Sequence, residues 1–364
     1  MENKKRWVNV DIAKALGLKV NKFNKYRLSP EKWEQVQELN RNLGLLKAQA
    51  ITQVVASNIP YYWDKTKEIS AFVKNPLYKP DNDFEALKNE LLEEVKSYAP
   101  NYKTFDRTEC NEAHLLVIDP ADVHIGKLCS TFEIGTEYNS QIAVKRVLEG
   151  VQGVIQKSRG YNVDQINLII GNDILHIDTP KRTTTSGTPQ DTDGMWHTNF
   201  LIAKKLYVDV IERLLQHANV HVTYNPSNHD YTNGFFLAQV IEAHFRNCDQ
   251  VTFDTSISHR KYYVYHNNLI GTTHGDGAKA NDLPLLMAHE SKQWSECTKR
   301  YWYTHHLHHK WAKDYMGVNV EGLRSPSEAD SWHHRNGYEH SPKAIEGFIH
   351  HKEHGKIAQF SHYF

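Results

Sequence analysis

The chain has 364 residues, of which 40% are hydrophobic and 24% are charged. This length predicts roughly two domains with ample core material, and no apolar run approaches the ~20 residues that a membrane-spanning helix needs. The 43 basic and 43 acidic residues give a formal net charge of zero, which argues against a general polyanion-binding surface but leaves local basic patches open.

The N-terminal residues and the cysteines both indicate a cytoplasmic protein. Residues 1–6 lead into no apolar stretch of the kind found in secretion signals. The four cysteines lie far apart without a C-x-x-C pair, so we expect reduced thiols and neither a disulfide framework nor a zinc knuckle. They are Cys110, Cys129, Cys248 and Cys297.

Residues 1–60 are predicted to form a small helical module. Asp11 is placed to cap a short helix that Gly17 would end, and a second helix is expected after Gly17. Residues 1–28 carry eight Lys or Arg, and the spacing fits a helix-turn-helix that contacts DNA. An ordinary helical hairpin with a solvated basic face would produce the same pattern, so both interpretations stay open.

Residues 61–111 are predicted to be a linker followed by an amphipathic helix. The linker is rich in Pro, Tyr, Asp and Asn, and apolar residues from Phe84 onward have helical spacing up to Pro100, which would end the helix. From about residue 112, apolar strand patterns alternate with helical patterns. This alternation predicts an α/β layered domain over residues 112–364.

Five strands and four helices are predicted inside this domain. The strands cover residues 115–118, 166–170, 220–224, 269–272 and 301–303. The helices cover residues 140–157, 198–217, 235–245 and 284–296. After residue 316 the strand signals are weaker.

Short polar clusters follow the predicted strands in one fixed order: Asp122-Val123-His124, Gly171-Asn172-Asp173, Asn228-His229-Asp230, His274, and His306-Leu307-His308. They offer carboxylate, imidazole and amide ligands without a thiolate, which is the ligand set of a site for divalent cations such as Mn²⁺, Fe²⁺ or Zn²⁺. Two such ions about 3.5–4 Å apart clamp the attacking and leaving oxygens of a phosphoryl displacement. The clusters therefore indicate a phosphoester hydrolase, although each one alone is compatible with an ordinary turn.

Residue chemistry indicates roles for several cluster members. In an extended segment Asp122 and His124 would face the same side and could reach one metal ion. Asp173 follows a strand at the end where sites form in open α/β sheets, and its two carboxylate oxygens could bridge two cations. The amide oxygen of Asn228 is a neutral ligand, so the adjacent His229 is expected to point past the metal toward the leaving group.

The last cluster has a register that is ambiguous by one residue. His306 and His308 would share one face of an extended segment, with the apolar Leu307 turned toward the core. His305 and His309 bracket this pair. Because the intervening residue should be apolar, we expect His306 and His308 to be the ligands.

The ordered clusters resemble those of the calcineurin-like metallophosphoesterase superfamily over about residues 113–310. The resemblance implies an α/β fold, a sandwich of two mixed β-sheets flanked by helices. It implies one metal ion held by Asp122, His124, Asp173 and His308. A second ion would be held by Asp173, Asn228, His274 and His306, with His229 as the catalytic histidine and Asp230 orienting it.

Two segments resemble a narrower group, the SbcD-like DNA-repair nucleases. They are D-V-H-I-G at residues 122–126 and D-I-L-H at residues 173–176, and the resemblance implies that His176 assists catalysis. The arginine that protein phosphatases carry after their bridging aspartate is absent from residues 174–178. Three positions depart from the superfamily pattern without removing a ligand: Asn172 is inserted, and Ser227 and His305 replace glycines.

A polar loop, residues 179–197, separates the second and third clusters. It carries Lys181 and Arg182, which are candidate substrate-binding residues. The loop has too little apolar material for a core of its own. We therefore expect it either to cover or contact the substrate or to be a disordered connection.

We expect a phosphodiester hydrolase that uses two Mn²⁺ ions, with Fe²⁺, Zn²⁺ and Ni²⁺ as the other metals considered. The SbcD-like segments and the basic residues 1–28 favour a nuclease acting on DNA. Zero net charge favours the alternative, a phosphodiesterase or phosphatase for a small nucleotide or other small phosphoester. The complete set of candidate metal ligands argues against a non-catalytic module. A DNA-binding regulator built on residues 1–42 is also disfavoured, because it would assign no role to most of the chain.

Overall fold

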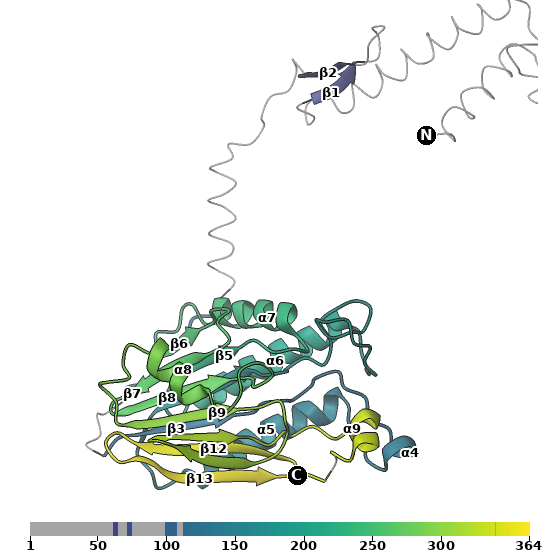
Figure 1. Ribbon diagram of the computed structural model, residues 1–364. Helices are drawn as coiled ribbons and strands as arrows, with labels where there is room; N and C mark the ends of the chain where they lie inside the picture. The colour runs from purple at the N-terminus through teal and green to yellow at the C-terminus, as the bar shows by residue number, and fades with distance from the viewer. Residues whose placement is uncertain (1–60, 65–70, 75–98, 108–111, 339) are drawn as a thin grey trace, which may run out of the picture. The chain divides into compact units, whose positions relative to one another are not determined.

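The computed structural model describes residues 61–64, 71–74, 99–107, 112–338 and 340–364 (Figure 1). The predicted helical module at residues 1–60 lies outside this part of the chain, as does the amphipathic helix predicted from Phe84. Within the predicted linker, β1 (Tyr61–Asp64) and β2 (Ala71–Lys74) form an antiparallel pair. This pair belongs to the first of two units, Met1–Val95 and Lys96–Phe364. The domain boundaries at residues 60 and 111 stay predictions.

Two mixed sheets form the second unit (Figure 1). The six-stranded sheet has the order β13 (Gly355–Tyr363), β12 (Ala344–His351), β3 (His114–Asp119), β4 (Val163–Gly171), β5 (Asn219–Asn225) and β6 (Val251–Asp254). The five-stranded sheet has the order β10 (Trp311–Tyr315), β11 (Val318–Gly322), β9 (Lys299–Thr304), β8 (Asn268–Thr273) and β7 (Lys261–Tyr265). Strands β3 to β6 run parallel, as do β8, β9 and β11, and the remaining neighbours are antiparallel.

Helices cover the outer faces of the two sheets (Figure 1). Three long helices pack on the six-stranded sheet: α5 (Ser140–Lys157), α6 (Trp196–Leu215) and α7 (Tyr231–His244). The shorter α8 (Leu283–Glu290) packs on the five-stranded sheet through Leu283 and Met287. Two one-turn helices, α4 (Thr131–Ile134) and α9 (Ser331–Asn336), lie in loops. Among the described helices, none combines the length and apolar character that crossing a bilayer requires.

Strand β3 explains why the predicted strands read as continuous apolar runs. Its alternate residues Leu116 and Ile118 pack with the helices, while Leu115 and Val117 face the other sheet. Because the central strands are covered on both faces, polar alternation is lost. The structure therefore has the predicted α/β class with two mixed sheets.

The end of helix α8 and the late strands differ from what the sequence predicted. Helix α8 ends at Glu290 and not near residue 296, because Ser291 adopts an extended backbone conformation and a turn follows. Among the strands after residue 316, which gave weak signals, β12 buries charged and polar side chains. Glu346 and His350, for example, are fully buried.

Glu346 should contribute strongly to stability, because it is a fully buried carboxylate between two cations. Its oxygens lie 2.5 Å from Arg324 Nη1 and 3.3 Å from Lys310 Nζ. Removing Glu346 takes the carboxylate away from Arg324, while Lys310 keeps a second partner, Glu321, at 2.5 Å, so we expect Glu346→Ala to lower the free energy of unfolding by about 3 kcal/mol. Urea denaturation measures this loss.

The matched control is Asp209→Ala, which breaks an exposed pair with Arg213 whose side chains are 40% and 46% exposed. A solvent-screened pair of this kind should contribute less than about 1 kcal/mol. Equal, small losses in both variants would contradict a stabilising role for the buried network.

Candidate metal and catalytic site

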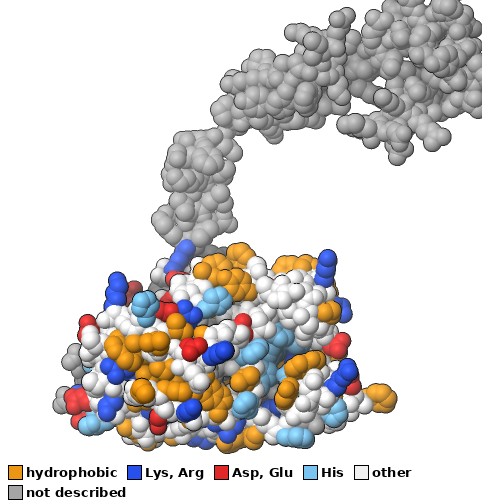
Figure 2. All heavy atoms as spheres, viewed as in Figure 1, with side chains coloured by type: hydrophobic (Ala, Val, Ile, Leu, Met, Phe, Trp, Pro, Cys, Tyr) orange, Lys and Arg blue, Asp and Glu red, His pale blue; other side chains and the backbone are white. Residues whose placement is uncertain are grey.

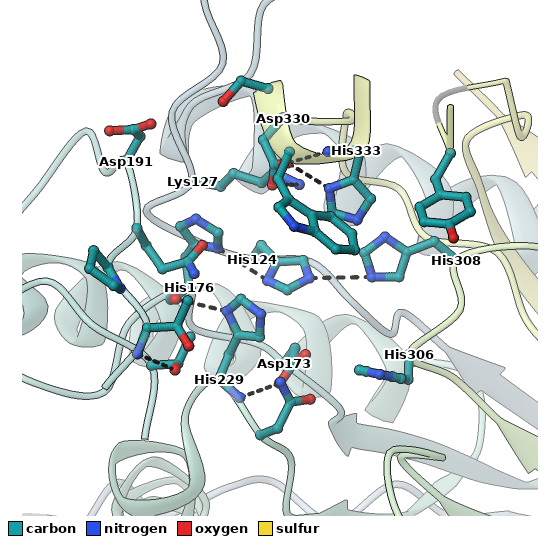
Figure 3. Close-up of a pocket in the computed structure, with 18 of the residues that line it drawn as sticks. His124, Lys127, Asp173, His176, Asp191, His229, His306, His308, Asp330 and His333 are labelled. Atoms are coloured by element: carbon teal, nitrogen blue, oxygen red, sulfur yellow. Dashed lines mark hydrogen bonds and ion pairs between the residues drawn. The ribbon is translucent and has the colours of Figure 1, made fainter. Parts of the chain in front are cut away.

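The five polar clusters meet at one edge of the two sheets, and Figure 3 shows members of four of them around the pocket. They follow β3, β4, β5, β8 and β9, whose carboxyl ends lie together because these strands are parallel within each sheet. His306 and His308 face Asp173, His124 and His229 across the pocket in Figure 3. Figure 2 shows histidine side chains gathered in a hollow on this face of the molecule.

Six non-glycine residues of the site have a left-handed backbone conformation. The φ angles lie between 49° and 70° at Asp122, His124, Asn172, Asp173, His306 and His308. Each such conformation destabilises the folded state by about 1–3 kcal/mol and persists only where contacts with the surrounding structure hold it. Here the amides of Asp122 and His124 donate hydrogen bonds to the carbonyls of Asn172 and Asp173, at 2.8 and 2.9 Å.

This backbone corrects one expectation from the sequence. Neither the D-x-H nor the H-x-H segment is extended, so alternation along a strand does not bring their side chains together. Leu307 is 57% exposed and lines the pocket, whereas the sequence predicted that it would face the core. The left-handed turns place the flanking histidines instead.

Asp122, His124 and His308 form a first group of donors that could hold a metal ion. His308 Nε2 lies 3.3 Å from Asp122 Oδ1 and 3.4 Å from His124 Nε2. Neighbouring ligands around a tetrahedral ion with ~2.1 Å bonds are about 3.4 Å apart, so this spacing fits a metal. Asp122 Oδ1 is also fully buried without a hydrogen-bond partner, as expected for an atom that a cation would satisfy.

Asp173, His274 and His306 form a second group of donors. His274 Nε2 lies 3.1 Å from Asp173 Oδ2 and 2.9 Å from the amide oxygen of Asn228. All four residues predicted for the second ion are therefore brought together. The distances again match those between neighbouring ligands, although a bridging role for Asp173 stays a prediction.

Electrostatics favour the metal-binding protonation states of His124, His308 and Asp173. Burial lowers the pKa values of His124 and His308, which keeps their imidazoles neutral. Burial would by itself raise the pKa of Asp173, but the nearby His274 and His229 outweigh it and hold the pKa below its usual value. Neutral imidazole and ionised carboxylate are the forms that coordinate cations. Burial would lower the pKa of His274, but Asp173 raises it to about 9, so in this geometry His274 pairs with Asp173 as a cation.

His229 is held in one orientation by two backbone contacts. Its amide donates to Asp173 Oδ1 at 2.9 Å, and its Nδ1 lies 3.0 Å from the carbonyl oxygen of His176. Because a carbonyl only accepts, Nδ1 carries the proton and Nε2 is left for the pocket. His176 also lies beside the ring, with the two ring centroids 5.3 Å apart.

The sequence predicted that Asp230 would orient the His229 ring, but its carboxylate makes other contacts. Its carboxylate accepts hydrogen bonds from Ser227 Oγ at 2.7 Å and from the Leu175 amide at 2.8 Å. The carbonyl of His176 takes the orienting position instead. Ser227, which replaces a glycine of the superfamily pattern, also accepts from the Asp173 amide at 2.7 Å and so links two of the clusters.

Of the four histidines at positions 305, 306, 308 and 309, two lie in the donor groups and two do not. His305 is buried, and its ring nitrogens contact Asp119 Oδ2 and the Thr273 carbonyl at 2.8 and 3.1 Å. His309 is exposed and contacts the Leu307 carbonyl. His306 and His308 lie in the two donor groups, but their binding of metal stays a prediction.

The site opens into a pocket of about 730 Å³ that the 179–197 loop helps to line. Backbone hydrogen bonds order the loop, for example from the Thr184 amide to the Thr188 carbonyl at 2.9 Å. The loop is therefore a wall of the pocket and not a disordered connection. Lys181 and Arg182 are exposed and are not among the lining residues, so their contact with substrate is an untested prediction.

Sequence reasoning missed several pocket residues, among them Lys127, Asp330 and His333. The buried Lys127 Nζ lies 3.1 Å from Asp330 Oδ2, and Asp330 Oδ1 lies 2.6 Å from His333 Nδ1. The only available signal was the position of Lys127, three residues after His124. Asp330 and His333 lie in the region after residue 316 that gave weak signals.

No protein-family model matches the sequence, and no curated protein matches it. Among solved structures, an archaeal phosphodiesterase is 12% identical, covering 68% of this chain and 99% of that one, with a TM-score of 0.34. Vps29 from Entamoeba histolytica, solved with zinc, is 11% identical over 69% of this chain and 98% of its own, with a TM-score of 0.30. A predicted phosphoesterase from Streptococcus pneumoniae is 14% identical over 68% and 98%, with a TM-score of 0.27. Similarity at this level carries no functional argument, so the assignment depends on the site itself.

Proposed function

We propose that this protein is a phosphoester hydrolase that depends on two divalent metal ions. The observation that carries the proposal is the convergence of two donor groups, Asp122–His124–His308 and Asp173–His274–His306, on one pocket. When bound, the ions would supply Lewis acidity and the positive charge that stabilises a phosphoryl-transfer transition state. Asn228 would complete the second group.

The chain's own residues would bind and orient the ester. His229 is held by Asp173 and by the His176 carbonyl, so its Nε2 is positioned to pass a proton to the departing oxygen. Lys127 Nζ lines the same pocket and could bind a phosphoryl oxygen. Asp330, which lines the same pocket, pairs with Lys127 at 3.1 Å.

Within this class we propose a phosphodiesterase, with a nuclease acting on DNA as the favoured form and Mn²⁺ as the favoured metal. The SbcD-like segments support this choice, as does the position of His176 beside His124 and His229. Contact with DNA through residues 1–28 belongs to the same proposal.

A phosphoesterase for a small nucleotide is the second candidate. The observation that favours it is the shape and charge of the site: a pocket whose lining includes one lysine, already paired with Asp330, and no arginine. A nuclease is expected to contact several phosphates through basic side chains. Among the described residues that line the pocket, Lys127 is the single Lys or Arg.

A substrate panel with Mn²⁺ tests both candidates. It compares bis-p-nitrophenyl phosphate, p-nitrophenyl phosphate, single- and double-stranded DNA, RNA and cyclic nucleotides. Cleavage of DNA and of the diester would support the nuclease, and cleavage of cyclic nucleotides alone would support the second candidate. Failure to hydrolyse any ester with Mn²⁺, Fe²⁺, Zn²⁺ or Ni²⁺ would refute the hydrolase.

The histidine register gives a sharp test of the ligand assignment. We expect His306→Ala and His308→Ala each to lose one metal ion and nearly all activity, because each removes a donor from a different group. His309→Ala, in the same run but exposed, should keep both ions and is the matched control. Metal content by atomic emission and hydrolysis of a diester measure the two effects. Loss of metal in His309→Ala, or full occupancy in His306→Ala, would overturn the register.

A further inference from the structure

Two exposed aromatic side chains line the pocket beside the metal donors. Trp332 is 60% exposed and Tyr338 is 64% exposed, although both are large and largely apolar. Their ring centroids lie 5.9 Å apart with the planes tilted by 41°. Both lie in or just after α9, and neither has a part in the proposed reaction.

A series of ring contacts connects this aromatic pair to the first donor group. The His333 ring stacks on His308, with centroids 5.4 Å apart and planes 16° apart. Trp332 packs edge-on against His333 at 5.2 Å. A single residue, His333, therefore separates Trp332 from His308 of the first donor group, where the phosphate would be held.

Contacts of Asp330 hold the start of α9, the helix that carries Trp332. Asp330 caps α9 by accepting a hydrogen bond from the His333 amide at 3.0 Å, and its other oxygen contacts the buried Lys127. Trp and Tyr side chains have only two χ angles, so they lose little conformational entropy when a ligand stacks on them. Such side chains suit a binding surface.

The rest of the pocket wall is polar. Thr184, Ser186, Thr188, Gln190 and Asp191 of the 179–197 loop line it, and Asp191 and His308 lie on opposite sides of His124 in Figure 3. A ligand here would meet aromatic rings on one side and hydrogen-bonding groups on another. A nucleobase matches this arrangement, since it has flat π-faces and polar edges. The volume of about 730 Å³ is far more than a phosphate alone needs.

We propose that Trp332 and Tyr338 form a base-stacking subsite for a nucleotide whose phosphate lies at the metal centre. The inference rests on the proposed hydrolase function and narrows its substrates to phosphoesters of nucleosides. It applies equally to a nucleotide in a DNA strand and to a free nucleotide. Stacking would hold the nucleoside part and so place the scissile phosphate.

Two esters with the same leaving group measure the effect of the nucleoside part: p-nitrophenyl thymidine 5′-phosphate and methyl p-nitrophenyl phosphate. We expect the protein to prefer the thymidine ester. Trp332→Ala should lower kcat/KM for that ester on the order of tenfold, the scale of base–aromatic stacking, and change the methyl ester less than about twofold. Trp332→Phe should retain most of the preference.

Phe132→Ala is the matched control, because Phe132 is 99% exposed but does not line the pocket. It should leave both esters unchanged. An unchanged preference in Trp332→Ala, or an equal loss on both esters, would overturn the subsite.

Binding separates failure of the subsite from failure of the hydrolase. The substrate panel decides the proposed function, and if no ester is hydrolysed, calorimetry with thymidine 5′-monophosphate and 2-deoxyribose 5-phosphate still decides the subsite. Trp332→Ala should weaken the nucleotide on the order of tenfold and leave the sugar phosphate unchanged. Equal affinity of the intact protein for the two ligands would overturn the stacking role.

Discussion

Replacing Asp173 with alanine should abolish hydrolysis and reduce bound metal below two ions per chain. Asp173 Oδ2 faces His274 at 3.1 Å in the second donor group, and its Oδ1 accepts the hydrogen bond that holds the His229 backbone. The change would thus remove a ligand and loosen the proposed proton donor at once. Metal content and diester hydrolysis, measured on the same preparation, check both effects.

Two further variants make this prediction specific. Asp173→Asn keeps an oxygen for the His229 amide but lacks the negative charge, so we expect it also to lose metal. Asp191→Ala removes an exposed carboxylate from the same pocket and should keep both ions. Full occupancy in Asp173→Ala, with activity within about tenfold of the natural protein (~1.4 kcal/mol), would show that Asp173 bridges nothing.

His229→Ala should separate chemistry from metal binding. The His229 ring is oriented by the His176 carbonyl, and we assign its free nitrogen to the leaving oxygen. Turnover should therefore fall by about 10²–10⁴, the usual scale of acid–base assistance, while both ions remain. Single-turnover hydrolysis together with metal analysis measures the two quantities.

The structure also contains the competing explanation. His124, His176 and His229 are themselves close enough to hold a cation, so His229 could be a ligand. Loss of an ion in His229→Ala would establish that alternative and remove the proton-donor assignment. His197→Ala, at an exposed histidine in the first turn of α6, is the control and should change neither quantity.

Sequence patterns were sufficient to locate the five strands that precede the polar clusters, and the clusters themselves, but not the other six strands of the two sheets. The central strands are apolar on both faces, as in β3, so a short window of residues identifies them without knowledge of their partners. The clusters follow directly because parallel strands bring their carboxyl ends to one edge. The α/β class and the list of candidate ligands depend only on such local signals.

Tertiary structure decided how those residues are oriented and what surrounds them. His124 and His308 are 184 residues apart, yet their rings meet because left-handed turns aim both at one point, and no local pattern predicts such turns at non-glycine residues. The same holds for Asp230, whose carboxylate turned out to contact Ser227 and Leu175, and for the aromatic pair after β11. These features arise from contacts between distant segments, and the free energy of those contacts is absent from any short stretch of sequence.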